Sequence, residues 1–251
     1  MKRLKDNFSN QSKSYKKYRP GYPKELYEII LSTIKTRNEC WDCGTGNGQV
    51  ANELSKYFKK VSATDISENQ IELAEKKANI QYQKIRSEST NFKSDQFDLI
   101  TVAQAIHWFD FQSFYKEVRR VGKKGGKLIV WGYGLVKIEK EIDDLVNKFY
   151  AQKMGSYWDI EREHIDSEYE TIEFDFKELQ SPSNLSIKSN WDVNHLIGFL
   201  NSWSSVQNYK VTNKGKNPVE EIAKELLKKW KKDELKQVKF PIFMKIGLIE
   251  K

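Results

Sequence analysis

The stretch WDCGTGNGQV, residues 41–50, constrains the fold more than any other part of this sequence. Gly44, Gly46 and Gly48 stand at every second position behind Asp42 and follow an apolar run. Glycine has no Cβ, so its backbone can turn tightly and approach a ligand closely. In open parallel sheets, ligands bind beyond the carboxyl ends of the strands, where the first strand-to-helix loop lies. The stretch therefore predicts a ligand-binding loop between a strand and a helix.

A second acidic residue narrows the kind of ligand. Asp65 ends a strand predicted at 60–64, and its carboxylate is placed to accept hydrogen bonds from both hydroxyls of a ribose. The loop pattern D-x-G-x-G-x-G differs from the G-x-G-x-x-G of dinucleotide sites, and no phosphate-cradling G-x-x-x-x-G-K-[ST] occurs. Taken alone, the three glycines could form a tight turn, and Asp65 could be a residue beside a helix N-cap. Together they predict a site for a nucleoside without a pyrophosphate.

The first half of the chain alternates short apolar segments with amphipathic ones. Strands are predicted up to Asp42 and at 60–64, 80–85, 97–102 and 127–132, and helices at 23–34, 49–58, 67–78 and 111–121, with a turn at 123–126. Strands that alternate with helices in this way form a parallel sheet covered on both faces.

After about residue 136 the pattern becomes irregular. Strands are predicted at 171–176, 184–189 and 240–250, and helices at 138–152, 191–203 and 217–230. We therefore predict an α/β fold with a Rossmann-like, seven-stranded, mostly parallel sheet, helices on both faces and a helical cap in the C-terminal half. Three parts are expected: a helical segment at 1–35 that closes over the ligand, a binding core at 36–136, and the rest of the sheet with its covering insertion at 137–251.

Composition argues against several classes of protein. No apolar run approaches the roughly 18 residues of a membrane span, and no apolar segment follows the basic N-terminus, so a secretory signal is not expected. Cys40 and Cys43 are too few for a disulfide framework, and we expect buried strand cysteines in a cytoplasmic protein. The net charge of +8 comes mostly from lysines spread over helical faces, which favours a solvated surface over a nucleic-acid surface. His107, His164 and His195 show no metal-ligand spacing, so no metal is expected.

Four stretches together resemble the class I S-adenosylmethionine-dependent methyltransferases: WDCGTGNGQV, ATDIS, FDLITVAQAIHWFD and GGKLIVWGY. YRPGYP, YWDIERE and FLNSWSSVQNY resemble a small-molecule subgroup that includes the trans-aconitate methyltransferase-like enzymes. The resemblance covers nearly the whole chain. It implies S-adenosylmethionine as cofactor, S-adenosylhomocysteine as product, and a small molecule as methyl acceptor. We expect a monomer or a weak homodimer.

The resemblance also implies which residues contact the cofactor. The backbone of Gly44, Thr45 and Gly46 would face its methionine part, with Asp42 beneath, and Asp65 would hold the ribose. Ile66 would pack on the adenine, and Ser87 and Glu88 would flank it. Gln104 would lie beside the transferring methyl. Tyr18 and Arg19 would close over the site, with Arg19 a candidate for binding the cofactor carboxylate. Arg86 departs from the family, which often has an acidic residue at that position.

Acceptor-binding residues are expected from the loop after the fourth strand and from the cap. His107 is the candidate catalytic residue, as a general base or, more in keeping with its loop position, as a positioning group. Trp108 follows it, and Trp158, Arg162, Trp203 and Tyr209 are further candidates, although aromatic residues at such spacing are also typical of a core. Arg162 would grip a carboxylate bidentately. A carboxylate acceptor is ionised at neutral pH and needs no base, so O-methylation of a carboxylic acid fits a sequence without an obvious catalytic dyad.

Two other functions are considered. A nucleic-acid methyltransferase, such as one acting on RNA, would account for the positive charge, but base amino-methylating enzymes usually carry N/D-P-P-Y/F where this chain has AQAIHW. A non-catalytic binding module would retain the fold without the cofactor, and the intact glycine loop and Asp65 argue against it.

Overall fold

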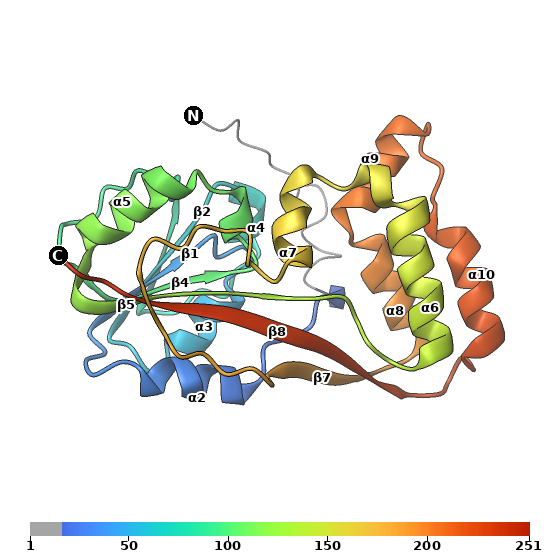
Figure 1. Ribbon diagram of the computed structural model, residues 1–251, viewed down its shortest axis with the longest axis horizontal. Coiled ribbons are helices and arrows are strands. Elements are labelled where there is room, and N and C mark those ends of the chain that lie inside the picture. The colour runs from blue at the N-terminus through green and yellow to red at the C-terminus, as the bar shows by residue number, and fades with distance from the viewer. Residues whose placement is uncertain (1–16) are drawn as a thin grey trace.

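The computed structural model describes residues 17–251, in which helices flank a central sheet and a helical cap lies at one end (Figure 1). The strands are β1 (Glu39–Cys43), β2 (Lys60–Asp65), β3 (Ile80–Lys84), β4 (Phe97–Ala103), β5 (Gly122–Tyr133), β6 (Lys177–Leu179), β7 (Ser186–Trp191) and β8 (Lys236–Leu248). They follow the order β3-β2-β1-β4-β5-β8-β6, and β7 also pairs with β8. The pairs from β3 to β5 are parallel, while β8 runs antiparallel to its three neighbours. The predicted α/β, Rossmann-like sheet is confirmed, with eight strands among the described residues.

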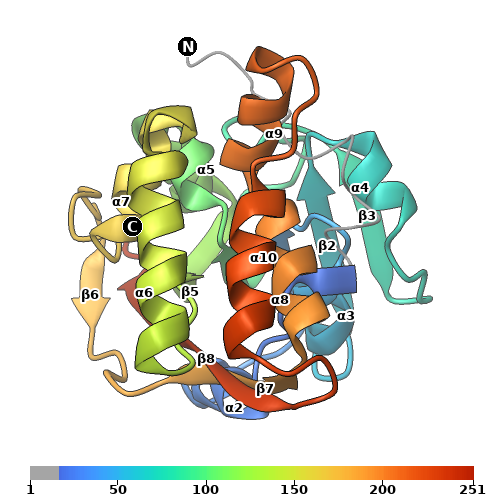
Figure 2. The same cartoon turned by 90° about the vertical axis from the view of Figure 1, so that its right-hand side faces the viewer.

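The helices divide between the two faces of the sheet and the cap. On the faces lie α2 (Lys24–Ser32), α3 (Gln49–Leu54), α4 (Glu68–Glu72) and α5 (Phe111–Val121); the cap contains α6 (Lys140–Lys148), α7 (Glu163–Asp166), α8 (Val193–Asn201), α9 (Ser204–Thr212) and α10 (Val219–Lys229). Figure 1 places α2 and α3 below the sheet and α5 above it, and Figure 2 shows the cap helices side by side in front of the sheet. None of the helices in residues 17–251 has the length and apolar character that crossing a bilayer requires.

Alternating side chains of the strands build a separate core on each face. Cys40 of β1 belongs to one buried cluster with α2 and α3, and Trp41 belongs to the other with Phe114 of α5. The first cluster continues without a break into the cap, where it includes Leu196 of α8 and Phe240 of β8. Core and cap therefore share one hydrophobic interior on that face. Both cysteines are buried, as predicted.

The last strand connects the core to the cap. Residues 236–241 of β8 pair with β7 near the cap, and residues 242–248 pair with β5 in the core. Figure 1 shows β8 as the long arrow that runs from beneath the cap across the sheet. Its apolar, β-branched and aromatic run FPIFMKIGLI suits a strand with neighbours on both sides.

Several predicted elements differ in the structure. The strand predicted at 171–176 is wrong, because Phe174 and Phe176 turn toward Tyr115 of α5, 6.2 and 5.2 Å between ring centres, and the edge strand forms only at 177–179. The turn predicted at 123–126 is a bulge within β5, opposite a register shift between Phe97 and Leu99.

Two helix predictions also need correction, and one helix of the structure has no counterpart among the predictions. The helix predicted at 67–78 ends at Glu72, where the next backbone bonds reach back only three residues. The helix predicted at 138–152 ends at Lys148 and continues as a π-helical turn over Phe149–Lys153. No helix was predicted at α9, which is largely polar and buries only Ser205 and Val206.

Candidate active site

The loop after β1 requires its glycines. Gly44, Gly46 and Gly48 have φ of +67°, +54° and +80°, which L side chains rarely adopt. A Cβ on Gly44 would lie 2.7 Å from the Cβ of Ala105, which follows β4. The loop backbone thus lies directly against the carboxyl end of β4, with no space for a side chain between them.

Asp42 holds this loop from beneath. Its carboxylate is 1% exposed and accepts hydrogen bonds from Thr45 Oγ1 (2.5 Å), the Ala51 N–H (3.1 Å) and Thr101 Oγ1 (2.9 Å). Burial raises the pKa of Asp42 to about 6, although the three hydrogen bonds act in the opposite direction. Asp42 therefore fastens the loop to α3 and to β4.

Asp65 stands at the carboxyl end of β2, beside the loop. Its Oδ2 accepts the Gly46 N–H and its Oδ1 accepts the Ser67 N–H, each at 2.8 Å. Both bonds come from backbone, and each carboxylate oxygen can accept more than one hydrogen bond. Ile66, the next residue, is half-buried at the same edge of the sheet.

The segment after β3 adds Ser87 and Glu88 to this edge. Ser87 is buried and accepts a hydrogen bond from the Cys43 thiol at 2.8 Å, so it joins the end of β1. Glu88 accepts the Asp110 N–H at 3.2 Å and pairs with Arg86 at 3.4 Å. Arg86, the departure from the family pattern, is thus neutralised by its neighbour.

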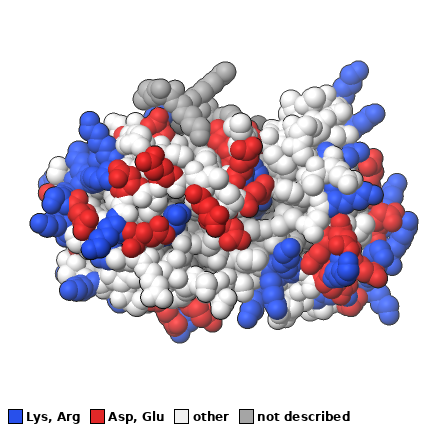
Figure 3. Space-filling view, in the orientation of Figure 1, with Lys and Arg blue, Asp and Glu red and all other residues white. Residues whose placement is uncertain are grey.

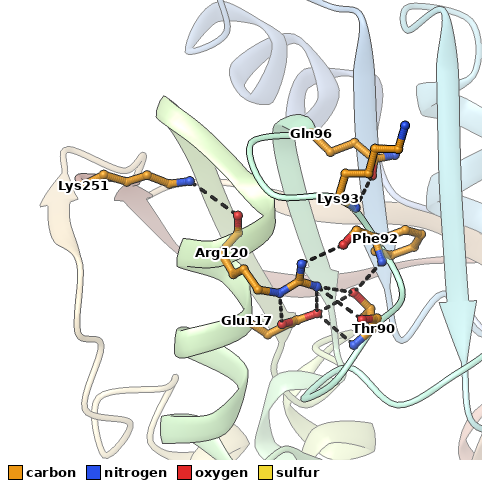
Figure 4. Close-up of polar contacts among 7 residues, drawn as sticks. All are labelled: Thr90, Phe92, Lys93, Gln96, Glu117, Arg120 and Lys251. Carbon is orange, nitrogen blue, oxygen red and sulfur yellow. Dashed lines mark hydrogen bonds and ion pairs between the residues drawn. The ribbon is translucent and has the colours of Figure 1, made fainter.

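An ion pair on α5 holds the same segment in place (Figure 4). Glu117 accepts the Thr90 N–H at 2.8 Å and pairs with Arg120 Nη2 at 2.6 Å. Arg120 Nη1 donates to the Phe92 carbonyl at 2.7 Å. Burial would raise the pKa of Glu117, but the hydrogen bonds from Arg120 and Thr90 outweigh it and lower the pKa. We call Glu117 and Arg120 the α5 clamp.

Gln104 joins the ends of β4 and β5. Its φ of +54° is strained for a residue other than glycine. Its N–H donates to the Trp131 carbonyl at 2.8 Å, its Oε1 accepts the Tyr133 N–H at 2.9 Å, and its Nε2 donates to the Tyr133 carbonyl at 3.3 Å. Strain of this kind is concentrated at functional sites.

A cavity opens between this edge and the cap. It holds about 510 Å³ of space, part of it open to solvent. Its lining comes from the N-terminal segment, the loop after β4 and the cap: Arg19, Gln104, His107, Trp108, Trp158, Asp159, Arg162, Ile165, Trp203 and Ser204. The structure therefore brings together five of the six candidate acceptor residues, His107, Trp108, Trp158, Arg162 and Trp203, with Gln104 and Arg19.

Arg19 lies between core and cap. Its Nη1 donates to the Tyr133 hydroxyl at 3.0 Å and its Nη2 donates to the Ser202 carbonyl at 3.2 Å. The guanidinium carbon also lies 5.2 Å from the centre of the Phe199 ring. Arg19 thus connects the end of β5 to the end of α8 at the cavity wall.

His107 is 5% exposed, in a short 3₁₀ turn after β4. Its Nδ1 lies 3.4 Å from the Tyr169 hydroxyl, and burial raises the pKa of that phenol, which stays protonated at neutral pH. Tyr169 and the preceding Glu168 have φ of +65° and +51°. A strained turn after α7 therefore places a buried phenol against the imidazole.

Arg162 lies against aromatic rings in the cap. Its guanidinium carbon is 4.9 Å from the Trp158 ring centre and 5.3 Å from that of Tyr150. Its Nε donates to the Tyr150 hydroxyl (2.9 Å) and to Asp166 (3.2 Å). Within residues 17–251, neither Nη group of Arg162 donates a hydrogen bond to the protein.

Two candidates lie away from the cavity. The Tyr18 ring packs on Gly198 of α8 and meets His195 edge-on at 5.4 Å. Tyr209 contacts Tyr157 at 4.9 Å between ring centres. Residues 1–16 of the segment that was expected to close over the ligand lie outside the described residues.

Comparisons with known proteins agree with this architecture. Residues 41–130 match the family model of the methyltransferase domain. The chain is 41% identical over 248 residues to a Dictyostelium discoideum protein described as a methyltransferase, covering 95% of this chain and 93% of that protein. The chain belongs to the class I S-adenosylmethionine-dependent methyltransferases.

Further similarities extend over the fold. A structure from Anaeromyxobacter dehalogenans, described as a type II methyltransferase, aligns with a TM-score of 0.85 at 33% identity, covering 93% of this chain and 99% of that one. An S-adenosylmethionine-dependent methyltransferase of Saccharomyces cerevisiae is 30% identical over 139 residues, which are 52% of this chain and 47% of that protein.

The edge of the sheet fits the cofactor of this methyltransferase family. The loop backbone has no side chain at its three glycines, and the Asp65 carboxylate offers acceptors for a ribose diol beside the half-buried Ile66. When bound, S-adenosylmethionine supplies an electrophilic methyl group. The contacts of individual residues with it stay predictions. Among residues 17–251, no group of His, Cys, Asp or Glu side chains is arranged to hold a metal ion.

Several residues of the site were not predicted from the sequence. Tyr133, Tyr150 and Tyr169 orient Arg19, Arg162 and His107. A tyrosine that orients another side chain has the same sequence signature as one in the core, so only the fold distinguishes them. Asp159, which also lines the cavity, is part of the WDIERE stretch, but its role was not anticipated.

Proposed function

We propose that this methyltransferase transfers a methyl group to a small carboxylic acid and forms a methyl ester. The proposal is based on the position of Arg162. This residue lines the cavity, its side chain is 20% exposed, and it lies on the Trp158 ring. Within residues 17–251 its two Nη groups donate no hydrogen bond, so they can donate to a bound acceptor. A guanidinium fork of this kind matches a carboxylate in geometry and in charge.

The chemistry requires little of the protein beyond positioning. A carboxylate is ionised at neutral pH, so no proton has to leave it before its oxygen bonds to the methyl carbon. Arg162 would fix the carboxylate, and His107, held by Tyr169, would orient the acceptor rather than act as a base. The surrounding Trp108, Trp158 and Trp203 would exclude water. The resemblance of YRPGYP, YWDIERE and FLNSWSSVQNY to the trans-aconitate methyltransferase-like enzymes supports such an acceptor.

The charge pattern supports a small acceptor more than a nucleic acid. On the face shown in Figure 3, lysine and arginine side chains alternate with aspartate and glutamate, and no continuous basic stripe crosses it. Several lysines are paired on the surface, such as Lys229 with Glu141 and Lys153 with Glu221. A cavity lined by three tryptophans also suits a small molecule better than a polymer.

The test is methyl transfer from labelled S-adenosylmethionine to a panel of small carboxylic acids, each paired with its amide. Label that base treatment releases as methanol identifies an ester. Arg162→Gln should lower kcat/KM for the acids about 10- to 100-fold, the value of a charge-assisted hydrogen bond. Arg119→Gln is the matched control, because Arg119 also lies on an aromatic ring and pairs with an aspartate, but on α5, outside the cavity lining. Transfer to the amides or to RNA but to no acid would overturn the proposal.

A further inference from the structure

Two residues of the cap that lie outside the cavity lining hold the Arg162 guanidinium. Tyr150 belongs to the π-helical turn Phe149–Lys153, and Asp166 ends α7. Arg162 Nε donates to the Tyr150 hydroxyl at 2.9 Å and to Asp166 Oδ1 at 3.2 Å. The Tyr150 hydroxyl in turn lies 2.7 Å from both carboxylate oxygens of Asp166. The three side chains therefore form one hydrogen-bonded group behind the cavity wall.

The direction of each hydrogen bond in this group follows from the chemistry of its members. A guanidinium only donates, and a carboxylate only accepts. Burial raises the pKa of Tyr150, so its hydroxyl keeps its proton at neutral pH. The hydroxyl therefore donates to Asp166 and accepts from Arg162 Nε. Each of these bonds has one ionised partner, which makes it stronger than a bond between neutral groups.

Aromatic rings fix the plane of the same guanidinium. Its central carbon lies 5.3 Å from the ring centre of Tyr150 and 4.9 Å from that of Trp158, and these two rings are 4.9 Å apart. The guanidinium thus lies across both rings. The Trp158 indole N–H donates to the Tyr150 carbonyl at 3.3 Å, so Tyr150 also holds the second ring. A planar cation that lies on aromatic surface with its Nε bonded has little freedom to rotate.

The π-helical turn explains how Tyr150 reaches this position. The Met154 N–H donates to the Phe149 carbonyl, five residues earlier, at 3.0 Å. In this wider turn the neighbouring rings of Phe149 and Tyr150 both contact Trp203, at 6.0 and 5.8 Å between ring centres. Turns of this kind occur frequently at functional sites. The turn thus connects the support of Arg162 to a tryptophan of the cavity lining.

We propose that Tyr150 and Asp166 are positioning residues of this methyltransferase, which hold Arg162 so that its two Nη groups meet the acceptor. The proposal rests on the carboxylic-acid function and adds to it the side chains that orient the anchor. With Nε bonded to the cap, one oxygen of the acceptor carboxylate would lie at each Nη group. Methyl transfer requires the attacking oxygen in line with the bond that breaks, and a misplacement of about 1 Å costs on the order of 100-fold in rate. A fork held in one orientation supplies this alignment.

The kinetics of variants measure whether Tyr150 acts through Arg162. The assay uses the acid with the highest kcat/KM in a panel that includes trans-aconitate and benzoate. Tyr150→Phe keeps the ring and removes the hydroxyl, and it should lower kcat/KM about tenfold. In an Arg162→Gln background the same change should cost less than about twofold, because no guanidinium is left to orient. Arg162→Lys should be about as poor as Arg162→Gln, because a point charge presents no fork.

Exchange of the Arg162 Nε proton tests the positioning without any acceptor. In NMR spectra of protein with isotope-labelled arginine, the Arg162 signal is the one that Arg162→Gln removes. Its Nε proton should exchange with water about tenfold faster in Tyr150→Phe and in Asp166→Ala than in the native chain, because each variant removes an acceptor that protects it.

Two matched controls lie elsewhere in the cap. Tyr157→Phe also removes a tyrosine hydroxyl that is hydrogen-bonded, in this case to Asn213. Asp144→Ala also removes an aspartate that pairs with a cation four residues away, as Asp166 does. Both controls should leave kcat/KM and the exchange of the Arg162 proton unchanged.

The outcomes distinguish this proposal from the carboxylic-acid function. Exchange of the Arg162 proton that neither Tyr150→Phe nor Asp166→Ala alters would overturn the positioning, whichever acids react. Faster exchange in both variants, with no acid methylated, would overturn the esterification and support the positioning. If an acid is methylated, an equal loss from Tyr150→Phe in both backgrounds, or an Arg162→Lys enzyme as active as the native one, would overturn the positioning and leave the esterification standing.

Discussion

The buried carboxylate under the glycine loop has a measurable effect on stability. Asp42 has a pKa of about 6 in the folded chain, against 3.8 for an ordinary aspartate, chiefly because it is buried. At 1.36 kcal/mol per pH unit, this difference means that ionised Asp42 costs the native state about 3 kcal/mol. Because folding raises this pKa, the favourable contribution is complete below pH 3.8 and is lost as the pH rises through 6.

Asp42→Asn should remove this pH dependence. For the wild-type chain, linkage predicts a loss of about 1.6 kcal/mol from Asp42 at pH 5 and about 3 kcal/mol at pH 7.5. The unfolding free energy of the wild type minus that of the variant should therefore fall by about 1.4 kcal/mol between these two pH values. Urea denaturation at both pH values measures it, and the difference between the proteins cancels their common titrations.

Asp98 provides a control of opposite sign. Burial would raise the pKa of Asp98, but hydrogen bonds from Lys123, Thr36 and the Glu39 and Asn38 backbones lower it instead. Its contribution is therefore present above the unfolded pKa and lost as the pH falls. Asp98→Asn should lose most stability at neutral pH and least in acid. A wild-type-minus-variant difference for Asp42→Asn that stays constant or grows between pH 5 and 7.5 would refute the reasoning about burial.

Three further perturbations test the cofactor edge. Asp65→Ala should weaken S-adenosylhomocysteine binding in calorimetric titration about 10- to 100-fold. Equal binding by the native protein and the variant would show that Asp65 is not part of the site. Glu68→Ala is the control, because Glu68 is an exposed acid nearby, and it should leave the affinity unchanged. Gly48→Ala should lower the unfolding free energy by more than Gly125→Ala does. Both glycines have φ near +80°, but only at Gly48 would the new Cβ lie 3.0 Å from Ala74. An equal loss of unfolding free energy in the two variants would show that backbone strain alone matters. Glu117→Gln should weaken the α5 clamp and reduce S-adenosylhomocysteine affinity severalfold; a lower melting temperature with unchanged affinity would show that the clamp serves stability alone.

The parallel half of the fold was predictable because its signals are local. A strand such as FDLITV is buried on both faces and is therefore continuously apolar, and the three positive φ values of the loop leave glycine as the residue of choice. The cap carries weaker signals. Helix α9 is largely polar and is stabilised by packing against other cap elements, so its own sequence does not indicate a helix. Strand β6 has only three residues, and the two phenylalanines before it pack on Tyr115 instead of extending the strand.

The cavity was predictable in its residues but not in its arrangement. Arg19, His107, Trp158 and Trp203 carry chemistry suited to a pocket, and the family resemblance picked them out. Their assembly depends on long-range contacts, such as that of Arg19 with Tyr133, 114 residues away. The strained turn that brings Tyr169 under His107 also has no local signal, since positive φ at a tyrosine is unusual.

The course of β8 bears on how this enzyme can be re-engineered. One continuous strand carries backbone ladders for both core and cap, and one apolar interior runs through both. Strands β6 and β7 lie within residues 137–235 and pair with β8. Exchanging residues 137–235 between relatives would therefore place foreign β6 and β7 strands against the native β8 and disturb their backbone pairing. New acceptor preferences should be accessible through individual wall residues of the cavity, with the scaffold left whole, and a chimera joined within β8 should fail to fold rather than acquire the donor's specificity.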